Sequence, residues 1–219
     1  MSFGEIYGAQ DNPRTLPSLV AAKELGLDLK LRPLDTLPKE EYLKLNPQGL
    51  IPTFVGADGF ILTESTAILL YIASQKENHT LLGKTKQEAA SVHRWLSYSN
   101  TQILPNLGGW FAPILGRRPY DEAAVNAAKE KTLENISIIA KHLEGREFLV
   151  GDGLTIADLF VAGQLTRGFS FVLDKEWREA NPGITAWAER IYALPAWREV
   201  IKEPVFIEKA ITYPYTPGQ

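Results

Sequence analysis

The residues best suited to hold a ligand lie between positions 46 and 65. Here a turn leads through Pro52 into a short apolar strand, and a second strand ends at Glu64 and Ser65. Because proline cannot donate to a sheet ladder, Pro52 is expected at the start or edge of its strand, which leaves the backbone of Ile51 free to pair. Glu64 and Ser65 fall at a predicted helix start, where unpaired N–H groups attract anions. Together these features predict a site for an extended peptide that carries a carboxylate.

The composition excludes several other kinds of chemistry. The 219 residues contain no cysteine, so a disulfide, a thiolate metal site and a cysteine nucleophile are all absent. The three histidines are widely spaced and form no ligand motif, so no metal is predicted. A formal charge of −3 gives no footprint for nucleic acid or an anionic membrane. No signal peptide or spanning segment is evident, so the cytoplasm is the expected location.

The first part of the chain predicts a small mixed sheet with helices. Its apolar spacing and turn residues give the order β-α-β-α-β-β-α within roughly the first 76 residues. The two closing strands form a hairpin, because they are joined by the turn-forming pair Asp58-Gly59. Strands are predicted at 3–7 and 27–34 and in the hairpin, and helices at 15–25, 39–45 and 66–75. This order predicts a thioredoxin-like domain of the α+β class.

Everything after a polar linker at 76–86 predicts helix, so the second domain is all-α. Pro105 is expected to kink or break the first helical run. The tail from 204 to 219 holds three prolines and is expected to lie as an extended strap. We therefore expect two domains, at residues 1–78 and 87–219. The helices predicted for the second domain are at 87–104, 120–143, 155–172, 182–194 and from 195 onward.

The motifs resemble those of cytosolic glutathione transferases along the whole chain. Residues 46–52 (Asn-Pro-Gln-Gly-Leu-Ile-Pro) resemble the family's NPxGxVP segment, and Glu64-Ser65 stand in the place of its ES pair. Residues 154–160 resemble the family's capping-box helix, in which Thr155 and Asp158 cap each other. Within the family, the chain is similar to the elongation factor 1B gamma-like class, the transferase-like N-terminal region of fungal elongation factor 1 gamma, at residues 2–4, 12–14, 54–59, 81–87 and 174–178.

The resemblance implies how glutathione, as co-substrate, would be held. In the family the peptide bond before the proline at the position of Pro52 is cis. This bond would turn the backbone of Ile51 towards the cysteinyl residue of glutathione, and the neighbouring Leu50 would belong to the same binding segment. Glu64 would face the γ-glutamyl ammonium and Ser65 its carboxylate, although these residues could also merely cap a helix. Elongation-factor subunits often depart from this pair, so its presence favours ligand binding. Gln48 and Lys44 could reach the glycyl carboxylate, and Lys44 could equally be a solvated helix charge.

The group that activates the thiol is harder to assign. A thiol has a pKa near 8.5, so the enzyme must supply a hydrogen-bond donor or a positive charge that favours the thiolate. The missing cysteine excludes the cysteine-type transferases. The family's serine-type position falls on Asn12, which has no hydroxyl. We rank Asn12 and Arg14 ahead of Tyr7 and Thr15 as the group that activates the thiol. Tyr7 ends the first strand, so its side chain could point into the core instead.

A pocket for the second substrate is a further expectation. One helical face carries four residues that could line an electrophile pocket over the first domain, provided that the helix continues through Pro105: Ser99, Gln102, Asn106 and Trp110. An aromatic residue on such a face is more often part of the core.

Two functions of different classes follow from the resemblance. The first is a homodimeric glutathione transferase that conjugates the thiolate to a small electrophile in detoxification, without metal or nucleotide. The second is a non-catalytic dimerisation and scaffold module of elongation factor 1 gamma, which would bind other translation elongation factor subunits. The chain ends without the lysine-rich linker and extra domain of such a subunit, so the enzyme is favoured if 219 residues are the natural product.

Overall fold

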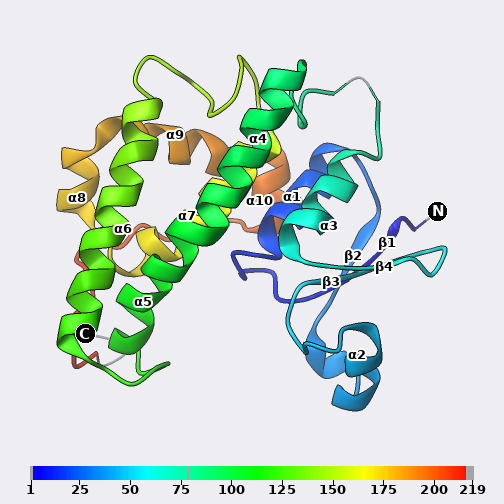
Figure 1. Cartoon of the computed structure of the whole chain (residues 1–219), viewed down its shortest axis with the longest axis horizontal. Helices are drawn as coiled ribbons and strands as arrows, with labels where there is room; N and C mark the ends of the chain where they lie inside the picture. The colour runs from blue at the N-terminus through cyan, green and yellow to red at the C-terminus, as the bar shows by residue number, and fades with distance from the viewer. Residues whose placement is uncertain (1, 78, 216–219) are drawn as a thin grey trace.

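A four-stranded sheet forms the first part of the computed structural model, which describes residues 2–77 and 79–215 (Figure 1). The strands run in the order β2-β1-β3-β4. β1 is parallel to β2 and antiparallel to β3, and β3 and β4 form the predicted hairpin. The strands are β1 (Gly4–Tyr7), β2 (Leu29–Arg32), β3 (Thr53–Gly56) and β4 (Ile61–Thr63). The predicted thioredoxin-like fold is therefore confirmed.

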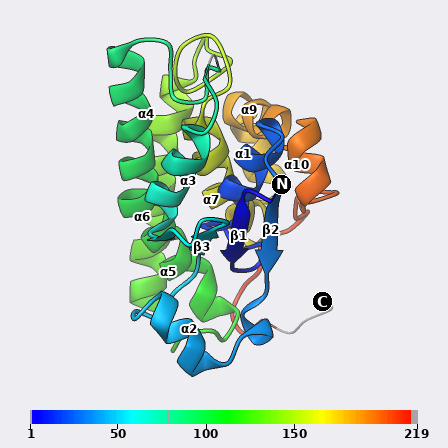
Figure 2. The same cartoon turned by 90° about the vertical axis from the view of Figure 1, so that its right-hand side faces the viewer.

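Three α-helices accompany the sheet, and the 3-10 turn Leu34–Thr36 precedes the second of them. They are α1 (Leu16–Glu24), α2 (Lys39–Leu45) and α3 (Ser65–Ala73). α1 and α3 pack together over one face of the sheet, whereas α2 lies on its other side (Figures 1 and 2). Ile6 of β1 and Phe54 of β3 are register partners, and both are fully buried. The core of this part therefore lies between the central strands and these two helices.

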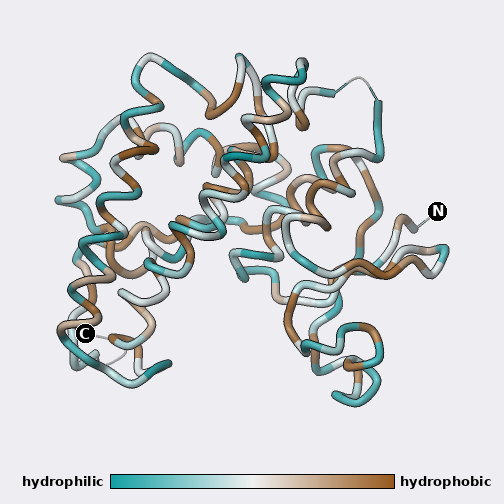
Figure 3. The backbone as a smooth tube through the Cα atoms, viewed as in Figure 1, coloured by the Kyte–Doolittle hydropathy of each residue, from teal (hydrophilic) through white to brown (hydrophobic). Residues whose placement is uncertain are grey.

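The second part of the chain is helical in the residues that the structure describes. α7 runs through its centre, and most of its residues are buried, as expected for a helix that is apolar on nearly all sides. Figure 3 shows hydrophobic residues along the strands and at the centre of this part, and hydrophilic residues over much of α4 and α6. The helices are α4 (Lys86–Tyr98), α5 (Leu104–Ile114), α6 (Glu122–His142), α7 (Ile156–Phe171), α8 (Lys175–Ala180), α9 (Pro182–Tyr192) and α10 (Pro195–Val200).

The expected effect of Pro105 needs a correction. The helical path does not break there, because the proline falls in the first turn of α5, where a missing N–H costs little. The geometry changes before the proline, in a π-helical turn over Ser99–Ile103 that joins α4 to α5. A π turn shifts the side chains that follow it around the helix axis, and such turns often occur at functional sites.

Asp158 holds the start of α7 and links it to two other segments. Its carboxylate accepts the Thr155 N–H at 3.1 Å and the Thr155 hydroxyl at 3.0 Å, so the predicted reciprocal cap is confirmed. It also accepts the Leu149 N–H at 2.8 Å and the indole N–H of Trp187 in α9 at 3.0 Å. Burial raises the pKa of Asp158, and these donors oppose that rise. The cap is thus one part of a buried network that joins α7 to α9.

The two parts of the chain pack closely along α1 and α7. A Cβ atom added at Gly163 of α7 would lie 2.7 Å from Cγ of Pro17 in α1, so only glycine allows this approach. Residues 204–215 of the tail contain no helix or strand, and residues 216–219 of the predicted strap lie outside the described residues. No helix among the described residues has the length and apolar character needed to cross a membrane.

Candidate functional site

A cavity of about 280 Å³ opens between the sheet part and the π turn of the helical part. It gathers the predicted ligand-holding residues other than Lys44, together with Arg14 and one residue from the π turn. The lining residues are Arg14, Asn46, Gln48, Leu50, Ile51, Pro52, Thr63, Glu64, Ser65 and Asn100.

Side-chain hydrogen bonds hold the loop before β3 in place. Asn46 is buried, and its Nδ2 donates to the Leu50 carbonyl at 2.8 Å and to the Thr53 hydroxyl at 3.1 Å. The Tyr42 hydroxyl donates to the same Leu50 carbonyl at 2.5 Å. With that carbonyl held by these side chains, the Ile51 N–H of the same trans peptide unit points away from them, and Ile51 lines the cavity. The loop is therefore fixed by side chains and does not depend on a ligand for its shape.

The Ile51–Pro52 peptide bond is cis, as the family resemblance implies. Pro52 is buried and Ile51 is half-buried, and both line the cavity. The backbone N–H and C=O of Ile51 form no hydrogen bond with any residue that the structure describes. A backbone donor and acceptor side by side at the cavity wall can pair with an extended peptide in the manner of an added strand.

Glu64 has an unusual backbone conformation for a residue other than glycine. Its φ of 69° and ψ of 117° make it the one non-glycine residue with a positive φ in the described chain. Such a conformation costs of order 1–3 kcal/mol and is typical of functional sites. Glu64 also precedes α3 without any side-chain cap hydrogen bond, so the alternative in which this residue simply caps the helix finds no support.

Ser65 is the first residue of α3 and is 5 % exposed, yet it lines the cavity. The first N–H groups of α3 have no carbonyl partner within the helix. Because those groups and the helix dipole favour negative charge, this end of the cavity suits a carboxylate. The adjacent Glu64 side chain is exposed and suits a positively charged amine. An amino acid with both groups fits the pair.

Arg14 brings a positive charge to the same cavity from the loop between β1 and α1. Burial, which removes water from its guanidinium, lowers the pKa of Arg14, and the charge of Glu64 partly offsets that effect. The two groups therefore lie within electrostatic reach of each other. A permanently charged guanidinium at this place stabilises an anion such as a thiolate, but it does not remove a proton.

The other three residues ranked for thiol activation are placed differently. Asn12 does not line the cavity, and its Oδ1 accepts the backbone N–H of Arg14 at 2.9 Å. Tyr7 ends β1 and packs against Tyr42, with ring centroids 5.9 Å apart. Thr15 is completely buried, and a Cβ atom added at Gly8 would lie 2.5 Å from its Oγ1. Among the four residues ranked for thiol activation, all of them in the described part of the chain, Arg14 is the one that lines the cavity.

Gln48 and Leu50 also line the cavity, and both are exposed. Lys44 lies outside its lining, on the exposed side of α2, where its Nζ is 2.7 Å from the Glu41 carboxylate. The structure thus brings Gln48 to the site and places Lys44 in the ion pair expected of a solvated helix charge.

The helical part contributes a residue that the sequence did not point to. Asn100 lies in the π turn, lines the cavity, and has a buried Oδ1 without a hydrogen-bond partner among the described residues. Buried polar atoms are normally paired, so an unpaired one at a cavity wall suggests that a ligand or water supplies the partner. Spacing along one helical face could not reveal it, because the π turn changes which residues face the sheet part.

The four residues expected to line an electrophile pocket do not reach this cavity. Ser99 is completely buried, and Trp110 is packed in the core with the Lys129 Nζ 5.7 Å from its ring centre. The Gln102 carbonyl accepts the Asn106 side-chain amide at 2.6 Å and so joins two turns of one helical run. Ser99 and Trp110 are therefore core positions, and none of the four lines the cavity at Ile51.

No group of three or more His, Cys, Asp or Glu side chains suited to a metal ion occurs in residues 2–77 and 79–215. The polar groups around the cavity are the Ile51 backbone, one carboxylate, one guanidinium, three side-chain amides and two hydroxyls.

Comparison with known proteins agrees with this geometry. The family model "Glutathione S-transferase, N-terminal domain" matches residues 3–74, and "Glutathione S-transferase, C-terminal domain" matches residues 95–195. The chain belongs to the glutathione S-transferase family. The first model covers the cis proline and the Glu64–Ser65 pair, and the second begins within α4 and ends at the start of α10.

Individual relatives of this glutathione S-transferase family member fall into two groups. Glutathione S-transferase stcT of Emericella nidulans is 47 % identical over 210 residues, which cover 95 % of this chain and 96 % of that protein. Elongation factor 1-gamma-A of Xenopus laevis is 33 % identical over 216 residues, and the chain spans 49 % of its length. The crystal structure of the GST-like domain of elongation factor 1-gamma from Saccharomyces cerevisiae superimposes with a TM-score of 0.85 at 28 % identity, covering 97 % of this chain and 99 % of that one.

Proposed function

We propose that this protein is a glutathione transferase that conjugates the thiolate of glutathione to a small electrophile. The observation that carries the proposal is the single cavity shared by the Ile51 backbone, the Glu64–Ser65 pair and the Arg14 guanidinium. Glutathione is an extended tripeptide with an amino-acid group at one end, a thiol in the middle and a carboxylate at the other end. Each of these groups has a complementary partner around the cavity.

In this proposal the γ-glutamyl end lies at the start of α3. Its ammonium group would pair with the Glu64 carboxylate, and its carboxylate would accept hydrogen bonds from the Ser65 hydroxyl and the N–H groups of the first helical turn. The cysteinyl residue would pair with the N–H and C=O of Ile51. The glycyl carboxylate would then extend towards Gln48, which lines the same cavity.

The cysteinyl sulfur would lie where the positive charge of Arg14 can act on it. A nearby guanidinium favours the thiolate over the thiol and so raises the fraction of reactive sulfur at neutral pH. The thiolate attacks an electrophilic carbon, a carbon–sulfur bond forms, and the leaving group departs with the electron pair of its former bond. Asn12 would act as a positioning residue, because its side chain holds the Arg14 backbone.

A scaffold role in translation elongation is the second candidate, and it belongs to a different class. The likeness to elongation factor 1 gamma supports it. The match to a glutathione S-transferase of nearly the same length favours the enzyme. The Glu64 backbone strain favours it as well, because a scaffold has no need to maintain a costly conformation at a cavity wall. We further propose a cytoplasmic homodimer, in keeping with the family.

Two measurements on the same preparation test the function. The protein is passed over immobilised glutathione, and conjugation of glutathione to a generic aryl halide is then followed against the uncatalysed rate. We expect retention and turnover for the wild type, loss of both for Glu64→Gln, and no change for Glu130→Gln, which alters an exposed glutamate of α6. Retention without turnover would favour the scaffold, and the absence of both would contradict the proposal.

A further inference from the structure

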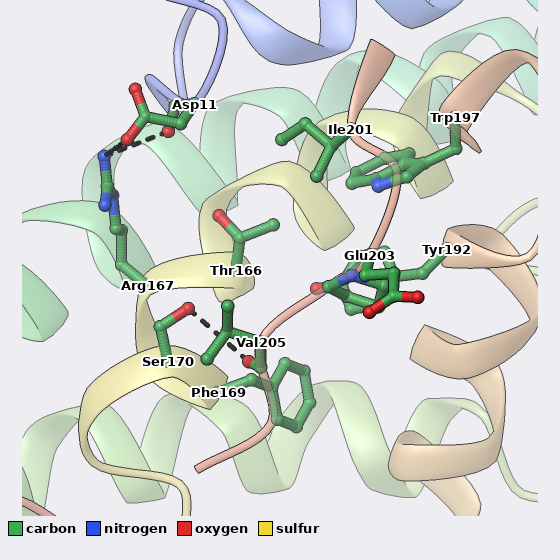
Figure 4. Close-up of a pocket in the computed structure, with 11 residues that line it drawn as sticks. Asp11, Thr166, Arg167, Phe169, Ser170, Tyr192, Trp197, Ile201, Glu203 and Val205 are labelled. Carbon is green, nitrogen blue, oxygen red and sulfur yellow. Dashed lines mark hydrogen bonds and ion pairs between the residues drawn. The ribbon is translucent and has the colours of Figure 1, made fainter. Parts of the chain in front are cut away.

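A second cavity lies on the other side of the loop that carries Arg14. It measures about 150 Å³, is partly open to solvent, and lies between α7, α9, α10 and the chain that follows α10 (Figure 4). Its inner wall is aromatic: Phe169, Tyr192 and Trp197 are each 1 % exposed or less. The segment 203–205 covers it from outside, and Val205 in that segment is 62 % exposed. None of its lining residues belongs to the cavity at Ile51.

The size and the wall together indicate the class of ligand. A volume of about 150 Å³ is enough for one benzene-sized ring. Aromatic walls add favourable edge and face contacts to a second ring. Tyr192 offers its ring only, because its hydroxyl already donates to the Ala162 carbonyl at 2.8 Å. The inner wall therefore selects a single flat hydrophobic ring.

One buried donor adds a polar requirement. The indole N–H of Trp197 is buried and has no hydrogen-bond partner among the described residues. Figure 4 shows this indole reaching from α10 towards Ile201, inside the ring of labelled side chains. A buried donor without a partner is costly, so a ligand that brings an acceptor to it gains more than its apolar area alone would give.

The charges of the rim favour a neutral ligand over an anion. The Arg167 guanidinium donates to the Asp11 carboxylate at 2.7 Å and to the Asp11 carbonyl at 3.1 Å, so its charge is already paired. The one other side chain of this lining that is charged at neutral pH is Glu203, which repels an anion. A carboxylate ligand would have no free cation to meet in this lining, and an ammonium group offers no acceptor to the Trp197 N–H.

We propose that this cavity binds a neutral molecule of one aromatic ring that carries a hydrogen-bond acceptor, such as an aryl ketone. The proposal concerns a second binding site and does not depend on the proposed transferase function. The site is linked to the first through one loop: Asp11 lines this cavity and Arg14 lines the other, and the Gln10 side chain donates to the Val200 carbonyl of α10.

The test uses the full chain labelled with ¹⁵N. Its five tryptophans give five indole N–H resonances, and Trp197→Phe identifies the one that belongs to Trp197. Acetophenone is titrated as the probe, and ethylbenzene, which has nearly the same shape and no acceptor, is titrated in parallel. We expect acetophenone to shift the Trp197 resonance saturably, with at least fivefold higher affinity than ethylbenzene, and to do so equally when glutathione is present in excess.

A matched pair of variants checks the location. Thr166→Leu fills the cavity, and Ser137→Leu adds the same side chain to the exposed face of α6. Both hydroxyls donate at 2.7 Å to the carbonyl three residues earlier, so both variants lose the same local bond. We expect loss of the Trp197 shift in Thr166→Leu alone. No saturable shift in the wild type, or an undiminished one in Thr166→Leu, would overturn the site. Equal affinity for ethylbenzene would overturn the role of Trp197, and displacement by glutathione would overturn the separation of the two cavities.

Discussion

Arg14 and Glu64 lie within electrostatic reach of each other on the wall of one cavity, although fifty residues separate them in the chain. The loop after β1 delivers the guanidinium, and the strained residue before α3 delivers the carboxylate. Neither forms an ion pair with the other among the described residues, so both charges remain available to a ligand. This arrangement suits a molecule with an amine and an acidic group some distance apart.

Replacing Arg14 by Gln is expected to raise the pKa of the bound glutathione thiol. The guanidinium favours the charged sulfur, and its removal leaves an amide of similar length without the charge. A rise of about one unit corresponds to about 1.4 kcal/mol of lost interaction. The ultraviolet absorbance of the thiolate, followed against pH in the saturated complex, measures it directly. Arg118→Gln, in the exposed loop after α5, serves as the matched control. An unchanged thiol pKa in Arg14→Gln would assign activation to another group.

Replacing Glu64 by Gly is expected to separate binding from stability. Glycine adopts a positive φ without strain, so the substitution relieves a cost of order 1–3 kcal/mol against about 0.5–1 kcal/mol of extra chain entropy in the unfolded state. The thermal midpoint of unfolding should therefore equal or exceed that of the wild type, while glutathione binding is lost. A clear drop in the midpoint would mean that the Glu64 side chain stabilises the fold, and calorimetry of both proteins decides the matter.

Asn100→Ala tests the contribution of the helical part to the site. The buried Oδ1 lacks a partner in the described chain, so we expect it to pair with a group of bound glutathione. Loss of one such bond is worth about 1 kcal/mol, or roughly a fivefold weaker affinity. Thr101→Ala is the control, since the neighbouring hydroxyl donates to the Ser97 carbonyl and lies outside the cavity lining. Equal affinities in all three proteins would show that the π turn does not touch glutathione.

Asp158→Ala is expected to destabilise the protein by about 3 kcal/mol without changing the glutathione affinity of the folded chain. The substitution leaves the buried N–H groups of Leu149, Thr155 and Trp187 without their acceptor. Denaturant unfolding gives the free energy, and calorimetry at a temperature well below the midpoint gives the affinity. A loss below about 1 kcal/mol would mean that the network relaxes easily.

The same carboxylate predicts a pH dependence. Burial raises the pKa of Asp158 above its ordinary value of 3.8, so the native state binds more protons than the unfolded chain between the two pKa values. The stability that this group contributes is therefore fully present below 3.8 and is lost as pH rises through the raised pKa. The Asp158→Asn variant has no titrating group at this position. As the pH rises from 3.8 through the raised pKa, the free energy of unfolding of the wild type should therefore fall relative to that of Asp158→Asn. A relative gain would mean that the four donors outweigh burial.

Much of the fold could be predicted from local sequence. Asp58-Gly59 specified the hairpin turn, and the apolar spacing around Leu19 and Ile68 specified helices that the structure contains. The cap of α7 was also visible, because Thr155 and Asp158 lie three residues apart. The remaining members of that network were not, since Trp187 comes from α9, and contacts between distant segments leave no periodic pattern in one sequence.

In the candidate site, too, the local motifs could be predicted and the contacts between distant segments could not. Pro52, Glu64 and Ser65 belong to one local motif, and the sequence placed them together. Asn100 and the core position of Trp110 could not be predicted, because the π turn before α5 changes the helical phase and has no sequence rule as strong as that of proline or glycine. The choice of Arg14 over Thr15 likewise depends on tertiary packing, which buries Thr15 completely.

The central claim is that the cavity at Ile51 binds glutathione through its peptide backbone and its γ-glutamyl end. Calorimetric titration of glutathione into the wild type and into Glu64→Gln tests it most directly. We predict one saturable site per chain for the wild type and at least a tenfold weaker site for Glu64→Gln, with unchanged thermal midpoints. Absence of saturable heat in the wild type up to millimolar glutathione, or equal affinity in the two proteins, would contradict the account.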